Sequence, residues 1–366
     1  MDMSNRSPSD ADGRVSQQRF TVLDGLRGVA AIAVVLYHAN LQLRLPYFLP
    51  RAYLAVDFFF VLSGFVIAHA YENGLRTRRL TSLAFLKSRV VRLAPLALLG
   101  SIIGLAILLL APAAMGEDPR NNPLFPVIVV TGLMLLPDIV PGGTRMYPLN
   151  APLWSLFYEL LANAAYALIA PRLSTRALFV LVVGAAMATL IASLGAHGVM
   201  YASPARVAYP FFAGVLVYRL WRAGKRAPGI HPMALAALLC AAFLIPDSSP
   251  LLSTAVDAAC VIAVFPLIVW IGASSAAKGF WKPACNLFGE MSYPLYVIHF
   301  PLMLVATLIL VRIPDQRIAL AALFLSVFGL AMLALWLSRV FDRPLRGALQ
   351  RVVFRARTPA LEFNPS

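Results

Sequence analysis

The sequence has too little charge to cover the surface of a soluble protein of its length. Asp, Glu, Lys and Arg make up 13% of the 366 residues, whereas 60% are hydrophobic. Soluble globular domains carry about 25% charged residues. This shortage argues against a soluble protein and makes the lipid bilayer the expected solvent.

Acidic residues and cysteines are also scarce. The 16 acidic residues oppose 31 Lys and Arg, which gives a net charge of +15. The basic residues stand in short breaks between apolar runs, as the positive-inside rule predicts for membrane proteins. We therefore expect no nucleic-acid partner. The three cysteines show no CxxC spacing, so the sequence predicts neither a disulfide framework nor a metal site.

Apolar stretches long enough for a membrane-spanning helix, about 17–25 residues, recur along the whole chain. They are 23–42, 54–72, 93–112, 152–170, 177–196, 205–221, 231–246, 252–273, 290–311 and 318–338. An eleventh stretch, 124–140, is shorter and interrupted by Pro126, Gly132 and Pro137. If it does not cross the membrane, most basic residues lie on the side of the N-terminus.

These stretches predict an all-α polytopic membrane protein with about ten transmembrane helices and both termini in the cytoplasm. We expect a polar cytoplasmic tail over residues 1–20, a membrane domain over 21–345 and a basic cytoplasmic tail over 346–366. Segment 124–140 would then belong to a long external excursion.

The first predicted span contains three ionisable residues, each of which costs roughly 2.5–3.5 kcal/mol to insert. Asp24 and Arg27 are close enough to pair. Arg27 and His38 are eleven residues apart, so they share one helical face at a separation of about 16 Å along the axis. His38 alone could be a buried residue that hydrogen-bonds another helix, but the polar stripe favours a functional site.

Other polar residues occur at the ends of later spans. Asp57 opens the second span, and Arg89 and Arg92 lie three residues apart where the third enters the membrane. The two arginines fit an ordinary positive-inside anchor or a site that grips phosphates with paired guanidinium groups. Further along, polar residues recur at helical spacing, where interhelical hydrogen bonding competes with a site role. These residues are Trp154, Ser155, Glu159, Ser292, Tyr296 and His299.

Five segments together resemble acyltransferase family 3, a group of membrane proteins that O-acylate glycans and related acceptors. They are the Arg27–His38 pair within LDGLRGVAAIAVVLYH, the run AVDFFFVLSGFVI, the pair Arg89-x-x-Arg92, the run LWSLFYE and the run SYPLYVIHFP. They follow the family's order over about residues 20–345. Each motif is weak alone, whereas five in order are specific.

The resemblance implies an O-acyltransferase of the bacterial inner membrane. Acyl-CoA, with acetyl-CoA as the first expectation, would be a substrate and no cofactor would stay bound. The resemblance assigns Arg27 and His38 to catalysis, and it assigns Arg89 and Arg92 to binding of the acyl donor. A glycan or another hydroxyl compound would be the acceptor. The acyl group, the acceptor and homo-oligomer formation stay open, as does the side of the membrane on which transfer occurs.

The predicted mechanism is acyl transfer with His38 as general base, because imidazole titrates near neutral pH. Glu159 and Asp57 are the candidate residues to orient it. Trp154, Ser155, Tyr296 and His299 are candidate substrate contacts. A covalent acyl-enzyme is an open alternative. The competing class is a proton-coupled transporter or flippase, in which the same intramembrane ionisable residues would form the pathway.

Overall fold

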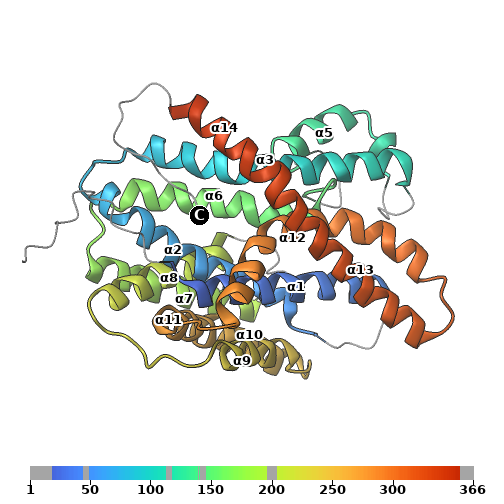
Figure 1. The fold of residues 1–366 in the computed structure, drawn as a ribbon. Helices are drawn as coiled ribbons and strands as arrows, with labels where there is room; N and C mark the ends of the chain where they lie inside the picture. The colour runs from blue at the N-terminus through green and yellow to red at the C-terminus, as the bar shows by residue number, and fades with distance from the viewer. Residues whose placement is uncertain are drawn as a thin grey trace, which may run out of the picture.

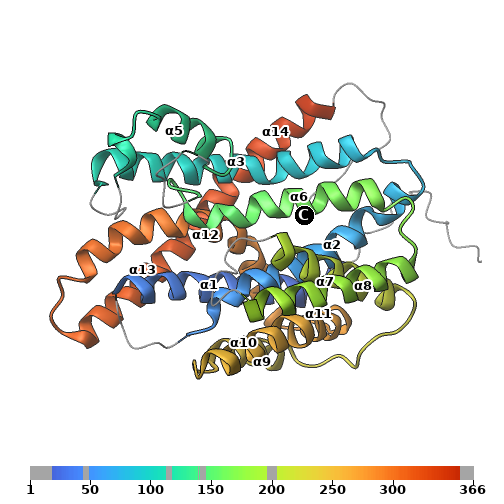
Figure 2. The same ribbon diagram turned by 180° about the vertical axis from the view of Figure 1, so that it is seen from behind.

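The computed structural model describes residues 19–43, 49–112, 118–138, 140, 146–195 and 204–354. All regular elements in these ranges are helical (Figures 1 and 2). The α-helices are α1 (Thr21–Leu43), α2 (Ala55–Arg76), α3 (Ser82–Leu110), α5 (Phe125–Leu133), α6 (Trp154–Ile169), α7 (Thr175–Gly195), α8 (Pro204–Arg222), α9 (Pro232–Leu244), α10 (Pro250–Ala259), α11 (Phe265–Ser274), α12 (Trp281–Leu310), α13 (Gln316–Leu337) and α14 (Arg343–Phe354).

Seven helical segments are long and apolar enough to cross a membrane. They are Thr21–Leu41, Ala52–Arg76, Ser82–Leu110, Thr175–Ala192, Pro250–Ser274, Trp281–Leu310 and Gln316–Phe354. The helices α6, α8 and α9 lie at the remaining predicted spans. The prediction of an all-α polytopic membrane protein is therefore confirmed. The count of ten and the cytoplasmic termini stay predictions.

The short helix α5 occupies the interrupted stretch 124–140. Its 9 residues rise only about 14 Å, less than half of a bilayer core of about 30 Å. It packs on α3 near the end where that helix finishes (Figure 1). A helix of this length does not cross the membrane, in agreement with the non-spanning interpretation.

The helices differ in how much of their surface the protein itself covers. Within α1, α2 and α12, 67%, 72% and 67% of the apolar window is buried, against 17% in α7. The outward faces of α7 and α13 are apolar, because membrane helices present such side chains to lipid. The helices α1, α2 and α12 therefore form the centre of the bundle, and five of the predicted site residues lie on them: Arg27, His38, Asp57, Tyr296 and His299.

Glycines bring α1 and α12 into close contact. A Cβ added at Gly28 would lie 2.5 Å from the carbonyl oxygen of Phe288, and one added at Gly289 would lie 2.7 Å from the Cβ of Asp24. Small residues allow membrane helices to approach each other in this way. The two helices run in the same direction, because Arg27 contacts Gly289 and, further along both helices, His38 contacts His299. This packing places both ends of the predicted stripe against α12.

The third helix begins before the apolar stretch predicted for it. The side chain of Thr81 accepts a hydrogen bond from the backbone N–H of Ala84 and caps the helix. The helix starts at Ser82, eleven residues before the predicted span at 93–112. As a result, Arg89 and Arg92 lie well inside α3, where Arg89 is buried.

Candidate active site

Arg27 is held against α12 by two hydrogen bonds and pairs with an acidic residue of its own helix. Its Nε donates to the hydroxyl of Ser292 at 2.8 Å, and its Nη2 donates to the carbonyl of Gly289 at 3.0 Å. Asp24 forms an ion pair with the same guanidinium at 3.1 Å, which confirms the predicted Asp24–Arg27 pairing. Arg27 is thus fixed at one end of the bundle, which we call the arginine end.

His38 lies at the opposite end of the stripe, beside a second histidine. Its ring centroid is 5.3 Å from that of His299 and 5.2 Å from that of Phe300. His299 is fully buried and contacts the backbone carbonyl of Tyr296 through Nδ1 at 2.7 Å. The structure therefore brings together two residues from opposite ends of the sequence. We call this region the histidine end.

Tyr296 and Ser155 extend the histidine end toward α6. Their hydroxyl oxygens are 2.7 Å apart, and each hydroxyl also lies 3.1 Å from the backbone carbonyl of Pro152. The ring of Tyr296 is 5.8 Å from that of His299. The predicted substrate contacts Ser155, Tyr296 and His299 thus form one continuous polar group.

The two carboxylates proposed to orient His38 have other partners. Asp57 is buried, and its carboxylate accepts two hydrogen bonds from Arg206, at 2.9 Å from Nε and 2.6 Å from Nη2. The same guanidinium lies over the ring of Trp154, 5.6 Å from its centroid. The charge of the buried Asp57 carboxylate is therefore compensated by Arg206 in an ion pair. Neither carboxylate contacts His38 within the described part of the chain.

Glu159 links three helices. One of its carboxylate oxygens accepts from Arg89 at 3.1 Å and from the hydroxyl of Ser63 at 3.0 Å. The Arg89 and Glu159 side chains are 9% and 17% exposed. Glu159 of α6 therefore has its cationic partner on another helix, at Arg89 of α3.

Arg92 differs from the other arginines at this end. Over the described residues it makes no hydrogen bond or ion pair, and its electrostatic neighbours include Arg89, Arg27 and Arg346. Asp342 is near enough to attract it but pairs with Arg346 at 2.8 Å. The arginine end thus carries a half-buried cation without a bonded partner, which favours the binding of an anion.

Sequence comparison decides between the two functional classes that the sequence left open. The acyltransferase 3 family model, described as an acyltransferase domain, matches residues 20–339. The chain belongs to the acyltransferase 3 family. It is therefore a membrane acyltransferase, and the transporter interpretation is set aside.

Two relatives show how far the similarity reaches. "Protein 2 in picA locus" of Rhizobium radiobacter is 39% identical to this acyltransferase over 165 residues, which cover 41% of this chain and 82% of that protein. The O-acetyltransferase OatA of Staphylococcus aureus (strain NCTC 8325) is 40% identical over 74 residues, which cover 20% of this chain and 11% of OatA. No solved structure matches the chain.

One arginine that sequence reasoning missed lies beyond the acyltransferase 3 match. Arg346 belongs to α14, yet the sequence assigned it to the tail 346–366, after the predicted domain 21–345. The helix passes over α3 (Figure 1) and places this side chain beside Arg92. The i,i+4 spacing of Asp342 and Arg346 was the available signal, because such pairs face each other on a helix.

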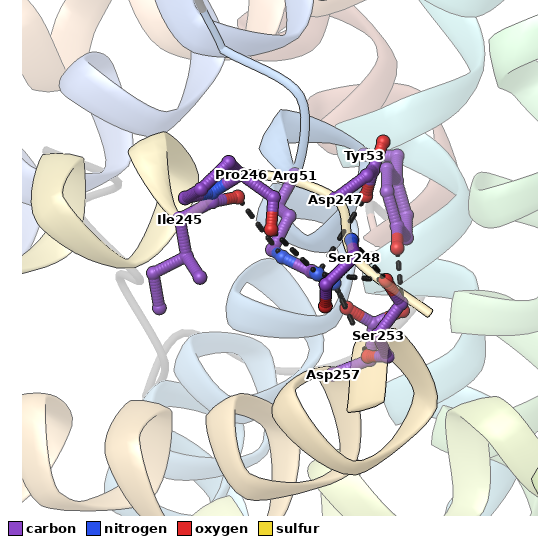
Figure 3. Close-up of polar contacts among 8 residues, drawn as sticks. All are labelled: Arg51, Tyr53, Ile245, Pro246, Asp247, Ser248, Ser253 and Asp257. Carbon is purple, nitrogen blue, oxygen red and sulfur yellow. Dashed lines mark hydrogen bonds and ion pairs between the residues drawn. The ribbon is translucent and has the colours of Figure 1, made fainter. Parts of the chain in front are cut away.

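A second missed residue is Arg51, whose side chain is fully buried. Figure 3 shows its guanidinium surrounded by acceptors from the α9–α10 connection and from α10. It donates to the carbonyls of Ile245, at 3.0 Å, and Ser253, at 3.2 Å, and it pairs with Asp257. The hydroxyl of Tyr53 donates to the same carboxylate at 2.5 Å. These bonds fasten the start of α2 to α10 in the acyltransferase, and they leave Arg51 a structural role.

The acidic, histidine and cysteine side chains do not suggest a metal centre. Among the residues that the structure describes, no three of them gather as ligands would.

Proposed function

We propose that this acyltransferase moves an acyl group, acetyl in the first instance, from acyl-CoA to a hydroxyl of a glycan or related acceptor. His38 is the general base. The observation that carries the proposal is the division of the site into an arginine end and a histidine end on the same helices. A donor with anionic phosphates and a distant thioester matches such a site.

The arginine end suits the phosphates of CoA. Arg92 lacks a bonded partner within the described residues and lies near Arg89, Arg27 and Arg346. Guanidinium groups bind phosphate through paired, charge-assisted hydrogen bonds. Arg89 and Arg92 hold the phosphates in this proposal, and Arg346 adds positive charge. Arg27 stabilises charge along the donor.

Polar groups on α12 connect the two ends. The hydroxyl of Tyr293 donates to the carbonyl of Leu93 at 2.5 Å, next to Arg92. Glu159 is an electrostatic neighbour of both Tyr293 and Tyr296. The extended arm of the donor would follow this polar face from the arginine end toward His38.

The histidine end supplies the chemistry of transfer. His38 takes the proton of the acceptor hydroxyl as the oxygen attacks the thioester carbonyl. One hydroxyl of the Ser155–Tyr296 pair would donate to the developing oxyanion after releasing the carbonyl of Pro152. Trp154, the residue before Ser155, provides an aromatic surface for a sugar acceptor in this proposal. Transfer of an acetyl group to an oxygen is supported by the similarity to the protein named O-acetyltransferase OatA.

The bacterial inner membrane is the proposed location. Both termini face the cytoplasm in this scheme, so the arginine end opens to the cytoplasmic acyl-CoA pool. The histidine end then lies toward the outer leaflet, where cell-surface glycans are assembled.

The test compares wild type, His38→Ala and Arg92→Gln in cells that lack their own copy of the gene. Ester-bound acyl groups on envelope and secreted glycans are measured by mass spectrometry, and the protein content of the membrane is matched. We expect His38→Ala to lower the transfer rate by about 10²–10⁴-fold. In membrane vesicles supplied with acetyl-CoA, Arg92→Gln should raise the acetyl-CoA concentration needed for half-maximal transfer.

Near wild-type acylation by His38→Ala would remove His38 from the role of base. If the wild type acylated no glycan and released no thiol from acetyl-CoA in membrane vesicles, the proposed reaction itself would be wrong.

A further inference from the structure

His299 has a defined tautomer. Its Nδ1 is 2.7 Å from the carbonyl oxygen of Tyr296 and 3.2 Å from that of Leu295. A carbonyl oxygen only accepts hydrogen bonds, so Nδ1 carries the proton. In a neutral imidazole the other nitrogen is then an acceptor. Nε2 of His299 therefore presents a lone pair.

This lone pair has no partner within the described part of the chain. Nε2 is buried and makes no hydrogen bond, and the whole residue is 0% exposed. A buried nitrogen without a hydrogen bond costs free energy of desolvation. We therefore expect Nε2 to gain a hydrogen-bond donor during the reaction.

The surroundings of His299 select that partner. The rings beside it belong to His38, Tyr296 and Phe300. Phe300 has no donor. The hydroxyl of Tyr296 is engaged by Ser155 and by the carbonyl of Pro152. His38 is the neighbour with an N–H to offer.

The spacing of the two histidines fits such a bond. An N–H···N contact of about 2.9 Å between two imidazoles, extended by the two ring radii, separates the ring centroids by about 5 Å. The observed centroid distance is 5.3 Å, with the ring planes inclined by 38°. The rings are therefore close enough for a rotation of the His38 side chain to bring one of its nitrogens to Nε2 of His299.

We propose that His299 is a positioning residue for His38, which rests on the proposed function of His38 as base. Nε2 of His299 accepts a hydrogen bond from one ring nitrogen of His38. The other nitrogen of His38 is then deprotonated and faces the acceptor hydroxyl. The chain of bonds ends at the carbonyl of Tyr296, so the backbone of α12 sets both tautomers.

The proton is conserved along this chain. As the acceptor oxygen bonds to the thioester carbonyl, its proton moves to the free nitrogen of His38. Collapse of the tetrahedral intermediate breaks the carbon–sulfur bond, and the same proton passes to the departing thiolate. His299 stays neutral throughout and keeps its own proton on Nδ1. The products are an ester and the free thiol of CoA.

A neutral orienting residue suits this location for an electrostatic reason. A carboxylate in the apolar core of the bundle needs a cation to offset its desolvation. The two carboxylates predicted for this task are already bound by Arg206 and Arg89. An imidazole acceptor orients His38 without adding a charge.

Two amide variants test the proposal because each copies one nitrogen of the imidazole. The side chain of His299→Asn reaches the Nδ1 position and can still donate to Tyr296, but it supplies no acceptor at Nε2. His299→Gln reaches the Nε2 position with an acceptor oxygen. Both are polar and of similar size, which makes them a matched pair for membrane insertion.

The measurement is release of CoA thiol from acetyl-CoA in membrane vesicles that contain the native glycans. We expect His299→Asn to lower the maximal rate by about 10²-fold or more, as for a base that loses its alignment. His299→Gln should stay within about tenfold of wild type. The acetyl-CoA concentration for half-maximal rate should change little in either, because the arginine end is untouched. In a His38→Ala background, His299→Asn should cause no further loss.

A purely structural His299 predicts the reverse order, since asparagine keeps the observed bond to Tyr296. Equal rates in both variants, or a faster His299→Asn, would overturn the proposal. So would an additive loss in the His38→Ala background. If the wild type released no thiol, or if His38→Ala released it as fast as the wild type, the proposed function itself would be wrong. That outcome does not depend on the His299 variants, so the two failures are distinguishable.

Discussion

The buried pair of Asp57 and Arg206 allows a quantitative prediction about stability. The two side chains are 1% and 5% exposed, and the guanidinium contacts both carboxylate oxygens. Removing one partner of such a pair leaves a buried charge without compensation, which costs about 3–5 kcal/mol. We expect Asp57→Asn to lower the free energy of unfolding by this amount.

The double variant Asp57→Asn/Arg206→Gln isolates the charge effect, because it leaves no uncompensated ion. It should be less destabilised than the sum of the two single variants. Some loss should remain, since Arg206 also donates to the carbonyl of Tyr53 at 3.2 Å and stacks on Trp154. The assay is unfolding of the purified protein by titration with a denaturing detergent.

The matched control is another Asp–Arg pair, in the connection after α3. Asp118 and Arg120 are 34% and 36% exposed. The carboxylate of Asp118 also accepts two hydrogen bonds from the guanidinium, at 2.7 Å from Nε and 2.6 Å from Nη2. Solvent screens an exposed pair, so Asp118→Asn should leave the unfolding midpoint unchanged. If Asp57→Asn unfolded like wild type yet abolished acyl transfer, Asp57 would act in the chemistry and the structural explanation would be refuted.

Two further variants test the packing that holds the site. Gly28→Ala should lower the rate of acyl transfer by about 10²-fold, because its Cβ would lie 2.5 Å from the carbonyl of Phe288 and shift α1 against α12. The control is Gly329→Ala, whose Cβ meets nothing within 4 Å and whose rate should match wild type. Arg51→Met should lower the free energy of unfolding by about 1–3 kcal/mol in the detergent titration, since it leaves the carbonyls of Ile245 and Ser253 without their donor. An unchanged midpoint for Arg51→Met, or equal rates for both glycine variants, would contradict these assignments.

Local periodicity was sufficient to predict the helices and the side chains that share a face. Each of the ten predicted stretches is helical, because apolar runs of that length have no other way to satisfy their backbone in lipid. Arg27 and His38 both meet α12, and Ser292 and His299 of the later stripe both meet α1. These relations depend on spacings of three, four, seven or eleven residues, which a helix fixes by itself.

The partners of the buried charges were not predictable from spacing. Arg89 and Glu159 are separated by 70 residues in the sequence, and Asp57 and Arg206 by 149. Such pairs depend on which helices pack together and at what height in the membrane. The sequence identified Asp57 and Glu159 as candidates to orient His38, whereas the fold pairs them with Arg206 and Arg89.

The two ends of the site differ in how they handle charge, and this difference fits the order of events in acyl transfer. At the arginine end, carboxylates bind Arg27, Arg89 and Arg346 while Arg92 lacks a bonded partner in the described chain. An anionic donor completes that arrangement before any bond is broken. At the histidine end the reactive groups are neutral imidazoles and hydroxyls, whose hydrogen bonds become stronger in a medium of low dielectric constant. Charge therefore develops beside His38 only during the reaction, where a base aligned by His299 would take up the proton.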